Sequence, residues 1–223
     1  TVGNLADFTS FSFHAVKNLT TAEGGCATWK HIDGIDDGEL YHLYQLYSLH
    51  GQSKDALAKT KAGAWEYDIV GPWYKCNMTD IMAAIGLVQL KRYPSLIQRR
   101  YEIVKKYDEA MDAMHIEHIQ HVSDVYHSSA HLYMIRIPDI SVEQRNEIIT
   151  RMAENGVATN VHYKPLPMMS GYKAYGWDIK DFPNAYHLYH NEITLPLHTL
   201  LSDEDVEIVI QTLRSTLEEM KLL

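Results

Sequence analysis

Residues Phe11–Gly25 read FSFHAVKNLTTAEGG. An apolar run typical of a β-strand carries Ser12 and His14 near its end, and Lys17 follows in a turn-rich stretch that a Gly-Gly pair closes. A lysine becomes a nucleophile towards an aldehyde when its pKa is lowered, and a loop at the end of a buried strand supplies the partial desolvation that lowers it. The segment therefore makes Lys17 a candidate catalytic amine.

The serine of this segment extends that interpretation. Ser12 lies five residues before Lys17, so its hydroxyl could hold a phosphate oxygen while the lysine reaches the aldehyde of the same cofactor. A lone lysine after a strand is more often a solvated surface group. The spacing by itself leaves both interpretations open.

Three sequence blocks go beyond spacing. The first is S-F-H-A-x-K-N-L-T-T-x-E-G-G from Ser12, the second is YKCNMTDIMAAIGLVQLKR over Tyr74–Arg92, and the third is His162-Tyr163 followed by Pro165-Leu166. In this order they resemble the DegT/DnrJ/EryC1/StrS family of sugar aminotransferases, which use pyridoxal phosphate. The resemblance covers nearly the whole chain and corresponds to the latter part of such an enzyme.

This resemblance implies an α/β fold of the fold-type-I pyridoxal phosphate transferases. Residues 1–114 would be the latter part of the cofactor-binding large domain, and residues 115–223 a small C-terminal α+β domain. Lys17 would form the covalent link to pyridoxal phosphate, and Ser12 would bind the cofactor phosphate. The active site would lie at a homodimer interface.

The second block resembles a family segment that reaches into the active site of the neighbouring subunit. Lys75 and Asn77 are its candidate contacts to the cofactor phosphate or the substrate. Cys76 stands between them, where the family often has an aromatic residue, so the resemblance does not extend to a stacking role there.

Three further residues are candidate substrate contacts by the same resemblance: His14, His162 and Tyr163. Pro167 follows the Pro-Leu pair where family members often have a histidine, which puts a substrate contact at that point in question.

The implied activity is the transfer of an amino group, with glutamate as the expected donor, to a nucleotide-linked keto sugar in lipopolysaccharide, capsule or other amino-sugar biosynthesis. Related dehydratases carry histidine where Lys17 stands, so the lysine favours transamination. In the family, the acidic partner of the pyridine nitrogen and the residue that covers the ring lie upstream of the lysine, and Asp7 is a poor match for the acid. The alternative is therefore a non-catalytic fragment or interaction subunit of such an enzyme.

Composition narrows the class of protein. The formal net charge of −9 over 223 residues argues against a nucleic-acid or anionic-membrane surface. No apolar run approaches the roughly 20 residues of a membrane span, and no signal-peptide pattern opens the sequence. A cytoplasmic enzyme is expected, with Cys26 and Cys76 as free thiols.

Histidines at intervals of three raise the question of a metal site. They are His115, His118 and His121, and they would share one face of a helix. The apolar residues between them indicate a passage from loop to strand instead, and no carboxylate completes a metal motif. No metal is expected.

The first half of the chain shows two strands, a helix and a loop. Leu5–Phe13 is dense in apolar residues and predicts a strand buried on both faces of a parallel sheet, with Cys26–Trp29 as the next strand. Asp36–His50 has the period of an amphipathic helix, and Gln52–Pro72 reads as a long surface loop.

A long helix is predicted to follow Thr79 and to run to about Met114, with Pro94 kinking or restarting it. Its first buried face would consist of Ile81, Ala84, Ile85 and Val88. The small residues Ala83, Ala84 and Gly86 would let another backbone approach closely.

The second half alternates strands with helices, which indicates a small α+β domain. Its predicted elements are the strands His131–Ile137 and Val157–His162 and two helices with capping boxes, Ser141 with Gln144 and Ser202 with Asp205. The first helix would end at Asn155-Gly156.

Overall fold

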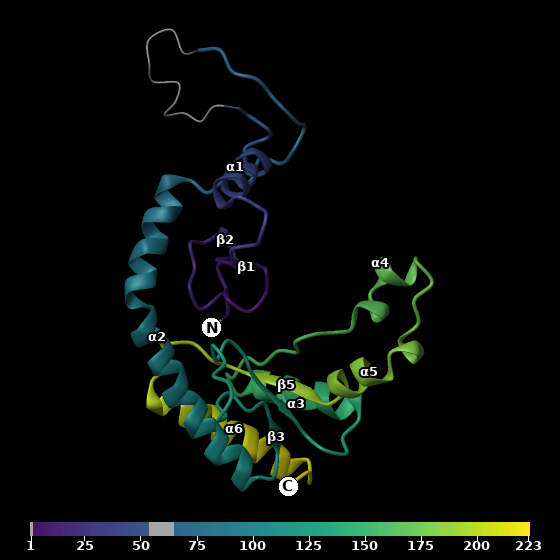
Figure 1. Ribbon diagram of the computed structural model, residues 1–223. Coiled ribbons are helices and arrows are strands. Elements are labelled where there is room, and N and C mark those ends of the chain that lie inside the picture. Colours follow the sequence, from purple (N-terminus) through teal and green to yellow (C-terminus); the bar gives the residue numbers. More distant parts are fainter. Residues whose placement is uncertain (1, 54–64) are drawn as a thin grey trace. The chain divides into compact units, whose positions relative to one another are not determined.

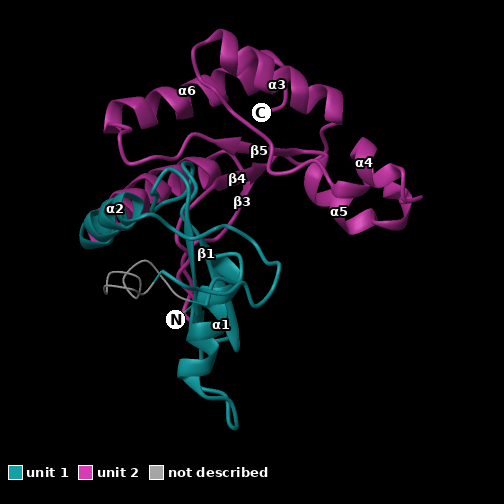
Figure 2. Cartoon of the chain, turned by 90° about the horizontal axis from the view of Figure 1, so that it is seen from above, with its two compact units in different colours: residues 1–93 teal, residues 94–223 magenta. Residues whose placement is uncertain are grey.

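The computed structural model describes residues 2–53 and 65–223, which divide into two compact units, residues 1–93 and residues 94–223 (Figure 2). The division falls inside the helix α2 (Asp80–Ala113), whereas the resemblance implied a domain boundary between residues 114 and 115. The domain limits of 1–114 and 115–223 therefore stay a prediction.

The first unit is built on a pair of short strands and a helix (Figure 1). Its elements are β1 (Phe8–Ser12), β2 (Gly25–Trp29), α1 (Asp37–Ser48) and the first part of α2. The two strands are antiparallel, with Phe8 opposite Trp29 and Ser12 opposite Gly25. The strand predicted at Cys26–Trp29 is thereby confirmed.

The prediction of a strand buried on both faces is wrong for β1. Its residues alternate between exposed and half-buried, and the side chain of Phe8 is 49% exposed. Thr9, Ser10 and Ser12 break the apolar run with hydroxyls. Among the described residues β1 pairs only with β2, and a two-stranded ribbon cannot cover both faces of a strand.

The helix predicted over Asp36–His50 is confirmed as α1. Asp36 is its N-cap and accepts a hydrogen bond from the backbone N–H of Glu39 at 3.0 Å. Tyr44 of this helix stacks on Trp29 of β2 with 5.2 Å between ring centroids. The loop predicted over Gln52–Pro72 lies partly outside the described residues, since residues 54–64 are not among them.

The first turns of α2 do not bury the face that their period marks. Ile81 is 77% exposed, Val88 57% and Ile85 45%, and Ala84 is exposed as well. The prediction of a buried face is therefore wrong, because no described segment packs over these side chains closely enough to bury them. The close approach of a backbone predicted for the small residues is not found at Gly86, where the described neighbour is a side chain: an added Cβ would lie 3.1 Å from the methyl group of Thr21.

The second unit is a three-stranded antiparallel sheet with helices packed on one face (Figure 1). Its strands are β3 (Glu117–His118), β4 (Tyr133–Arg136) and β5 (Glu192–Leu195), in the order β3-β4-β5. Its helices are the second part of α2, α3 (Val142–Glu154), α4 (Ser170–Lys173), α5 (Pro183–Tyr189) and α6 (Asp203–Glu219).

The core of this unit joins side chains from the sheet to side chains from α2, α3 and α6. Representative members that are fully buried are Tyr107, Ile135, Ile148, Ile193 and Leu213. From the second part of α2, Val104 and Tyr107 belong to this core. The helix assignment also continues through Pro94.

Both capping boxes are confirmed. Ser141 and Gln144 begin α3, and Ser202 and Asp205 begin α6, each pair satisfying two backbone N–H groups reciprocally.

The strand predicted at Val157–His162 is not formed: only Asn160 makes a bridge, to Thr194 of β5. The strand predicted at His131–Ile137 is confirmed as the shorter β4.

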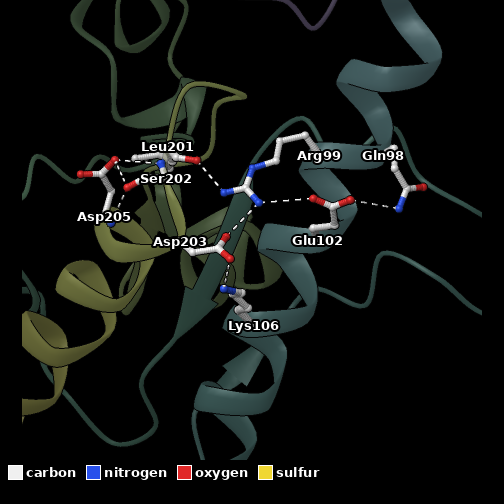
Figure 3. Close-up of polar contacts among 8 residues, drawn as sticks. All are labelled: Gln98, Arg99, Glu102, Lys106, Leu201, Ser202, Asp203 and Asp205. Carbon is white, nitrogen blue, oxygen red and sulfur yellow. Dashed lines mark hydrogen bonds and ion pairs between the residues drawn. The ribbon is translucent and has the colours of Figure 1, made fainter.

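Polar contacts tie α2 to the start of α6 (Figure 3). Arg99 contributes two of them, an ion pair to Asp203 at 2.9 Å and a hydrogen bond to the carbonyl of Leu201 at 2.6 Å. Lys106 reaches the other oxygen of Asp203 at 2.7 Å. The hydrogen bonds from Lys106 and then Arg99 lower the pKa of Asp203.

Candidate functional site

The lysine loop, residues 13–24, connects β1 to β2 and is closed at its neck by backbone hydrogen bonds. The N–H of Phe13 donates to the carbonyl of Gly24 at 2.8 Å, and the carbonyl of Phe13 accepts from the N–H of Thr21 at 2.9 Å. The hydroxyl of Thr20 donates to the same carbonyl at 3.2 Å. Because Thr21 is only 1% exposed, the neck is a fixed point from which the residues around Lys17 project.

The glycine pair at the end of the loop is required by packing. A Cβ on Gly24 would lie 2.4 Å from the Oγ1 of Thr21 and 2.6 Å from the Cε of Met78, and a Cβ on Gly25 would lie 2.6 Å from the carbonyl oxygen of Phe11. No side chain fits at these distances. The same contacts place Met78, and with it the segment just before α2, against the lysine loop.

The two groups that define the predicted site are both available for a ligand. Lys17 is half-buried, its N–H donates to the carbonyl of His14 at 2.9 Å, and its amine has no partner among the described residues. The Oγ of Ser12 accepts from the N–H of His14 at 3.3 Å. Since a hydroxyl also carries one donor, the proton of Ser12 remains free for an anionic oxygen.

The imidazole of His14 turns towards an acidic neighbour in the same loop. Its Nε2 lies 3.6 Å from an oxygen of Glu23, and both side chains are largely exposed. A protonated His14 forms a weak, solvent-screened ion pair there.

Lys75 and Asn77 lie together at the surface of the first unit. The amine of Lys75 donates to the amide oxygen of Asn77. The backbone around them is held by α1 and the residues after it: the N–H of Cys76 donates to the carbonyl of Ser48 at 2.8 Å, and that of His50 donates to the carbonyl of Tyr74 at 2.7 Å. Cys76 is a free, exposed thiol, as predicted.

Cys26 is also free, as predicted, and burial raises the pKa of its thiol.

The remaining predicted residues lie in the second unit. His162 is half-buried beside β5, and Tyr163 is 67% exposed with its ring edge-on to His162 at 4.6 Å. The predicted site residues thus fall into two groups: the lysine loop with Lys75 and Asn77 in one unit, and His162 with Tyr163 in the other.

Beside His162 lies a pocket of about 650 Å³ that the sequence analysis missed. Its polar lining includes Glu117, His118, Arg136 and Glu192. The only sequence signal for it was an acidic residue at the start of the apolar run EITL, residues 192–195. This residue is Glu192, and its side chain is only 4% exposed, which is unusual for a carboxylate.

The histidines at intervals of three are held separately. His118 lies 3.1 Å from carboxyl oxygens of both Asp108 and Asp112, whereas His121 contacts the hydroxyl of Ser128 at 2.7 Å. Burial lowers the pKa of His121. Over residues 2–53 and 65–223, no three histidine, cysteine or acidic side chains are arranged to hold a metal ion.

The helices of the described residues fall short of a membrane span. In the described part of the chain, none combines the length and the apolar character that crossing a bilayer requires.

Comparison with known proteins identifies the family of this chain. The profile of the DegT/DnrJ/EryC1/StrS aminotransferase family matches residues 1–214. The chain is 38% identical over 217 residues to the spore coat polysaccharide biosynthesis protein SpsC of Bacillus subtilis, covering 96% of the chain and 54% of SpsC. It is 33% identical over 220 residues to the UDP-4-amino-4,6-dideoxy-N-acetyl-beta-L-altrosamine transaminase of Campylobacter jejuni, covering 99% and 55%.

Solved structures agree with these matches. The putative sugar aminotransferase Spr1654 from Streptococcus pneumoniae in its PMP form has a TM-score of 0.93 and 57% identity, covering 100% of this chain and 55% of that one. PseC of Helicobacter pylori, an aminotransferase involved in the biosynthesis of pseudaminic acid, has a TM-score of 0.80 and 30% identity, covering 98% and 55%. The chain thus spans about half the length of the relatives it matches. The predicted α/β, fold-type-I class is confirmed.

Proposed function

Since the chain belongs to the DegT/DnrJ/EryC1/StrS aminotransferase family, we propose that it provides the lysine loop and the C-terminal part of an enzyme that aminates a nucleotide-linked keto sugar. The observation that carries the proposal is the amine of Lys17, which pairs with no described residue, on a loop with a fixed neck that follows Ser12, whose hydroxyl proton is bonded to no described residue.

The donor set of the loop fits pyridoxal phosphate. A primary amine that pairs with no described residue suits the aldehyde, and a free hydroxyl donor suits the phosphate, whose oxygens accept hydrogen bonds. Lys75 and Asn77 supply a further cation and amide for the phosphate or the substrate of a neighbouring subunit in a homodimer. The acidic partner of the ring nitrogen is assigned to no described residue, since Asp7 is exposed ahead of β1.

When bound, pyridoxal phosphate supplies an electrophilic aldehyde and an electron sink. Lys17 would hold it covalently through its amine. In its free form the same amine would act as a general base towards the proton on the α-carbon of the amino donor. Ser12 keeps the phosphate in place during this exchange, and His14, His162 and Tyr163 are the proposed substrate contacts.

The sugar class rests on the relatives. One is named for spore coat polysaccharide biosynthesis, and another is a transaminase of a UDP-linked amino sugar. We therefore assign a nucleotide-linked keto sugar as acceptor and glutamate as donor, in a cytoplasmic pathway that makes an amino sugar for lipopolysaccharide, capsule or a similar polysaccharide.

Reductive trapping tests the cofactor assignment without an activity assay. The protein is incubated with pyridoxal phosphate, reduced with sodium borohydride and digested, and the modified peptide is identified by mass spectrometry. We expect the label on Lys17 and none in Lys17→Arg. Lys30→Ala is the matched control, because the amine of Lys30 is already bound to the carbonyl of Leu5 at 2.6 Å.

A label on Lys30 or Lys75 in the parent protein contradicts the assignment of Lys17. A folded protein that takes up no label favours the alternative, a non-catalytic fragment or interaction subunit of such an enzyme.

A further inference from the structure

Part of the pocket beside His162 is formed by the face of the three-stranded sheet that is turned away from the core, whereas Asp112 of α2 and His118 of the edge strand β3 complete its lining. Ile135 and Ile193 belong to the core, and side chains alternate between the faces of a strand. Met134 and Arg136 of β4 therefore share the opposite face with their partners across the sheet, Thr194 and Glu192. This face is specified by the same register that builds the core.

A chain of hydrogen bonds runs along this face to His162. The carboxylate of Glu192 accepts the backbone N–H of His162 at 2.9 Å on one oxygen and the hydroxyl of Thr194 at 2.5 Å on the other. The Oγ1 of Thr194 lies 2.8 Å from the Nδ1 of His162. The pairing of Asn160 with Thr194 sets the backbone of this segment alongside β5.

These contacts determine which nitrogen of His162 carries the proton. The hydroxyl of Thr194 donates its single proton to an oxygen of Glu192. The Thr194 oxygen must then accept from His162, which requires a proton on Nδ1. In neutral His162, Nε2 is therefore an acceptor, and no described residue is bonded to it.

The charge of the pocket determines which kind of ligand can approach Nε2 of His162. Three carboxylates line it, from Asp112, Glu117 and Glu192, together with the guanidinium of Arg136 and the imidazole of His118. Arg136 is paired with Glu117, and His118 lies 3.1 Å from Asp112, so Glu192 is the lining carboxylate without a basic partner among the described residues. The excess of negative charge disfavours phosphates and carboxylates and favours a cation.

The apolar lining adds a second requirement. Ile119, Met134 and Leu188 offer surface for C–H groups, and a volume of about 650 Å³ suits a ligand the size of a sugar ring. A hydroxylated ring that carries an ammonium group meets both requirements.

We propose that this pocket binds the ammonium group of an amino sugar, with Nε2 of His162 as its acceptor and with Glu192 and Thr194 as positioning residues. The identity of the ring as a sugar rests on the proposed function, whereas the tautomer of His162 rests on geometry alone. The ligand matches the aminated side of the proposed reaction.

Side-chain nitrogen NMR on the protein labelled with ¹⁵N tests both parts. His162→Gln assigns the signals, and the parent protein should show the tautomer with the proton on Nδ1. Glucosamine should shift the Nε2 signal and bind about tenfold more tightly than glucose, as one charge-assisted hydrogen bond implies. Glucose 6-phosphate should bind more weakly than glucose.

Variants of Thr194 separate positioning from folding. Thr194→Val should release the tautomer and lower the affinity for glucosamine about tenfold, whereas Thr194→Ser should keep both. Thr150→Val on the exposed face of α3 is the matched control and should change neither. A proton on Nε2 in the parent protein overturns the proposal even if a variant does not fold.

The remaining outcomes are equally decisive. Equal affinity for glucosamine and glucose overturns the ligand class, and an unchanged tautomer in folded Thr194→Val overturns the positioning role. Borohydride labelling of Lys17 without any effect of glucosamine overturns the pocket and leaves the proposed function standing. Glucosamine binding without a label on Lys17 overturns the proposed function and leaves the pocket standing.

Discussion

The amine of Lys106 lies 2.7 Å from an oxygen of Asp203, which joins the second part of α2 to the first turn of α6. Arg99 holds the other oxygen of the same carboxylate at 2.9 Å (Figure 3). One exposed aspartate thus receives two cations from one helix and also lies at the positive end of the α6 dipole. The stability of the second unit should therefore depend on the ionisation of Asp203.

Asp203→Asn should lower the free energy of unfolding at neutral pH, and the loss should vanish in acid. The folded pKa of Asp203 is lowered by Lys106 and Arg99, so its contribution is present above the unfolded pKa of about 3.9 and is lost as the pH falls through the folded value. Urea unfolding of both proteins between neutral pH and about pH 3 measures the difference. Added salt should shrink it, because the side chain is exposed.

Glu204→Gln is the matched control for Asp203→Asn. Glu204 is exposed in the same first turn and has no ion pair among the described residues. If its loss equals that of Asp203→Asn, the helix dipole and not the ion pairs explains the effect.

Ser202→Ala should destabilise the protein by about 1 kcal/mol, the usual cost of losing an N-cap. Its Oγ accepts the N–H of Asp205 at 3.0 Å, and no alanine replaces that bond. Ser215→Ala, in an exposed position of the same helix, should instead stabilise by a few tenths of a kcal/mol, because alanine is the better helix former. Urea unfolding measures both, and equal signs for the two substitutions contradict the capping role.

Ser12→Ala should weaken pyridoxal phosphate binding by about one to two decades, which corresponds to about 1.5–3 kcal/mol for a hydrogen bond to a charged group. Pyridoxal lacks the phosphate, so its affinity should not change. Ser10→Ala is the control, because Ser10 occupies the same exposed face of β1. Equal losses for both ligands contradict the assignment of Ser12 to the phosphate.

The exposed face of α2 should cause self-association. Ile81, Ile85 and Val88 share one side of the helix at a spacing of three to four residues, and each is at least 45% exposed. We expect light scattering of this chain to show oligomers or aggregates that grow with concentration, and the double substitution Ile85→Ser with Val88→Ser to reduce them. Leu200→Ser, at an 87% exposed position in the second unit, should have no such effect. A chain that stays monomeric at every concentration contradicts this prediction.

Local signals in the sequence were sufficient for several elements. The capping boxes at Ser141 and Ser202 predicted where α3 and α6 begin, because a cap is formed by residues three apart. The motif around Lys17 identified the family for the same reason, since its residues are contiguous. The Gly24-Gly25 pair was predicted to close the turn-rich stretch after Lys17, and the structure adds that neighbouring atoms leave no room for a Cβ at either position.

The tertiary structure decided whatever depends on a distant partner. A period of 3.6 showed that one side of α2 is apolar, but whether Ile81 and Val88 are covered depends on which segments pack there. The apolar run before Lys17 suggested a buried strand, yet its pairing with β2 makes an exposed ribbon. The sequence did not predict a role for Glu192, because that role comes from its contacts with Thr194 and His162. Periodicity specifies which face of an element is apolar, whereas burial and hydrogen-bond partners are set by residues far away in the chain.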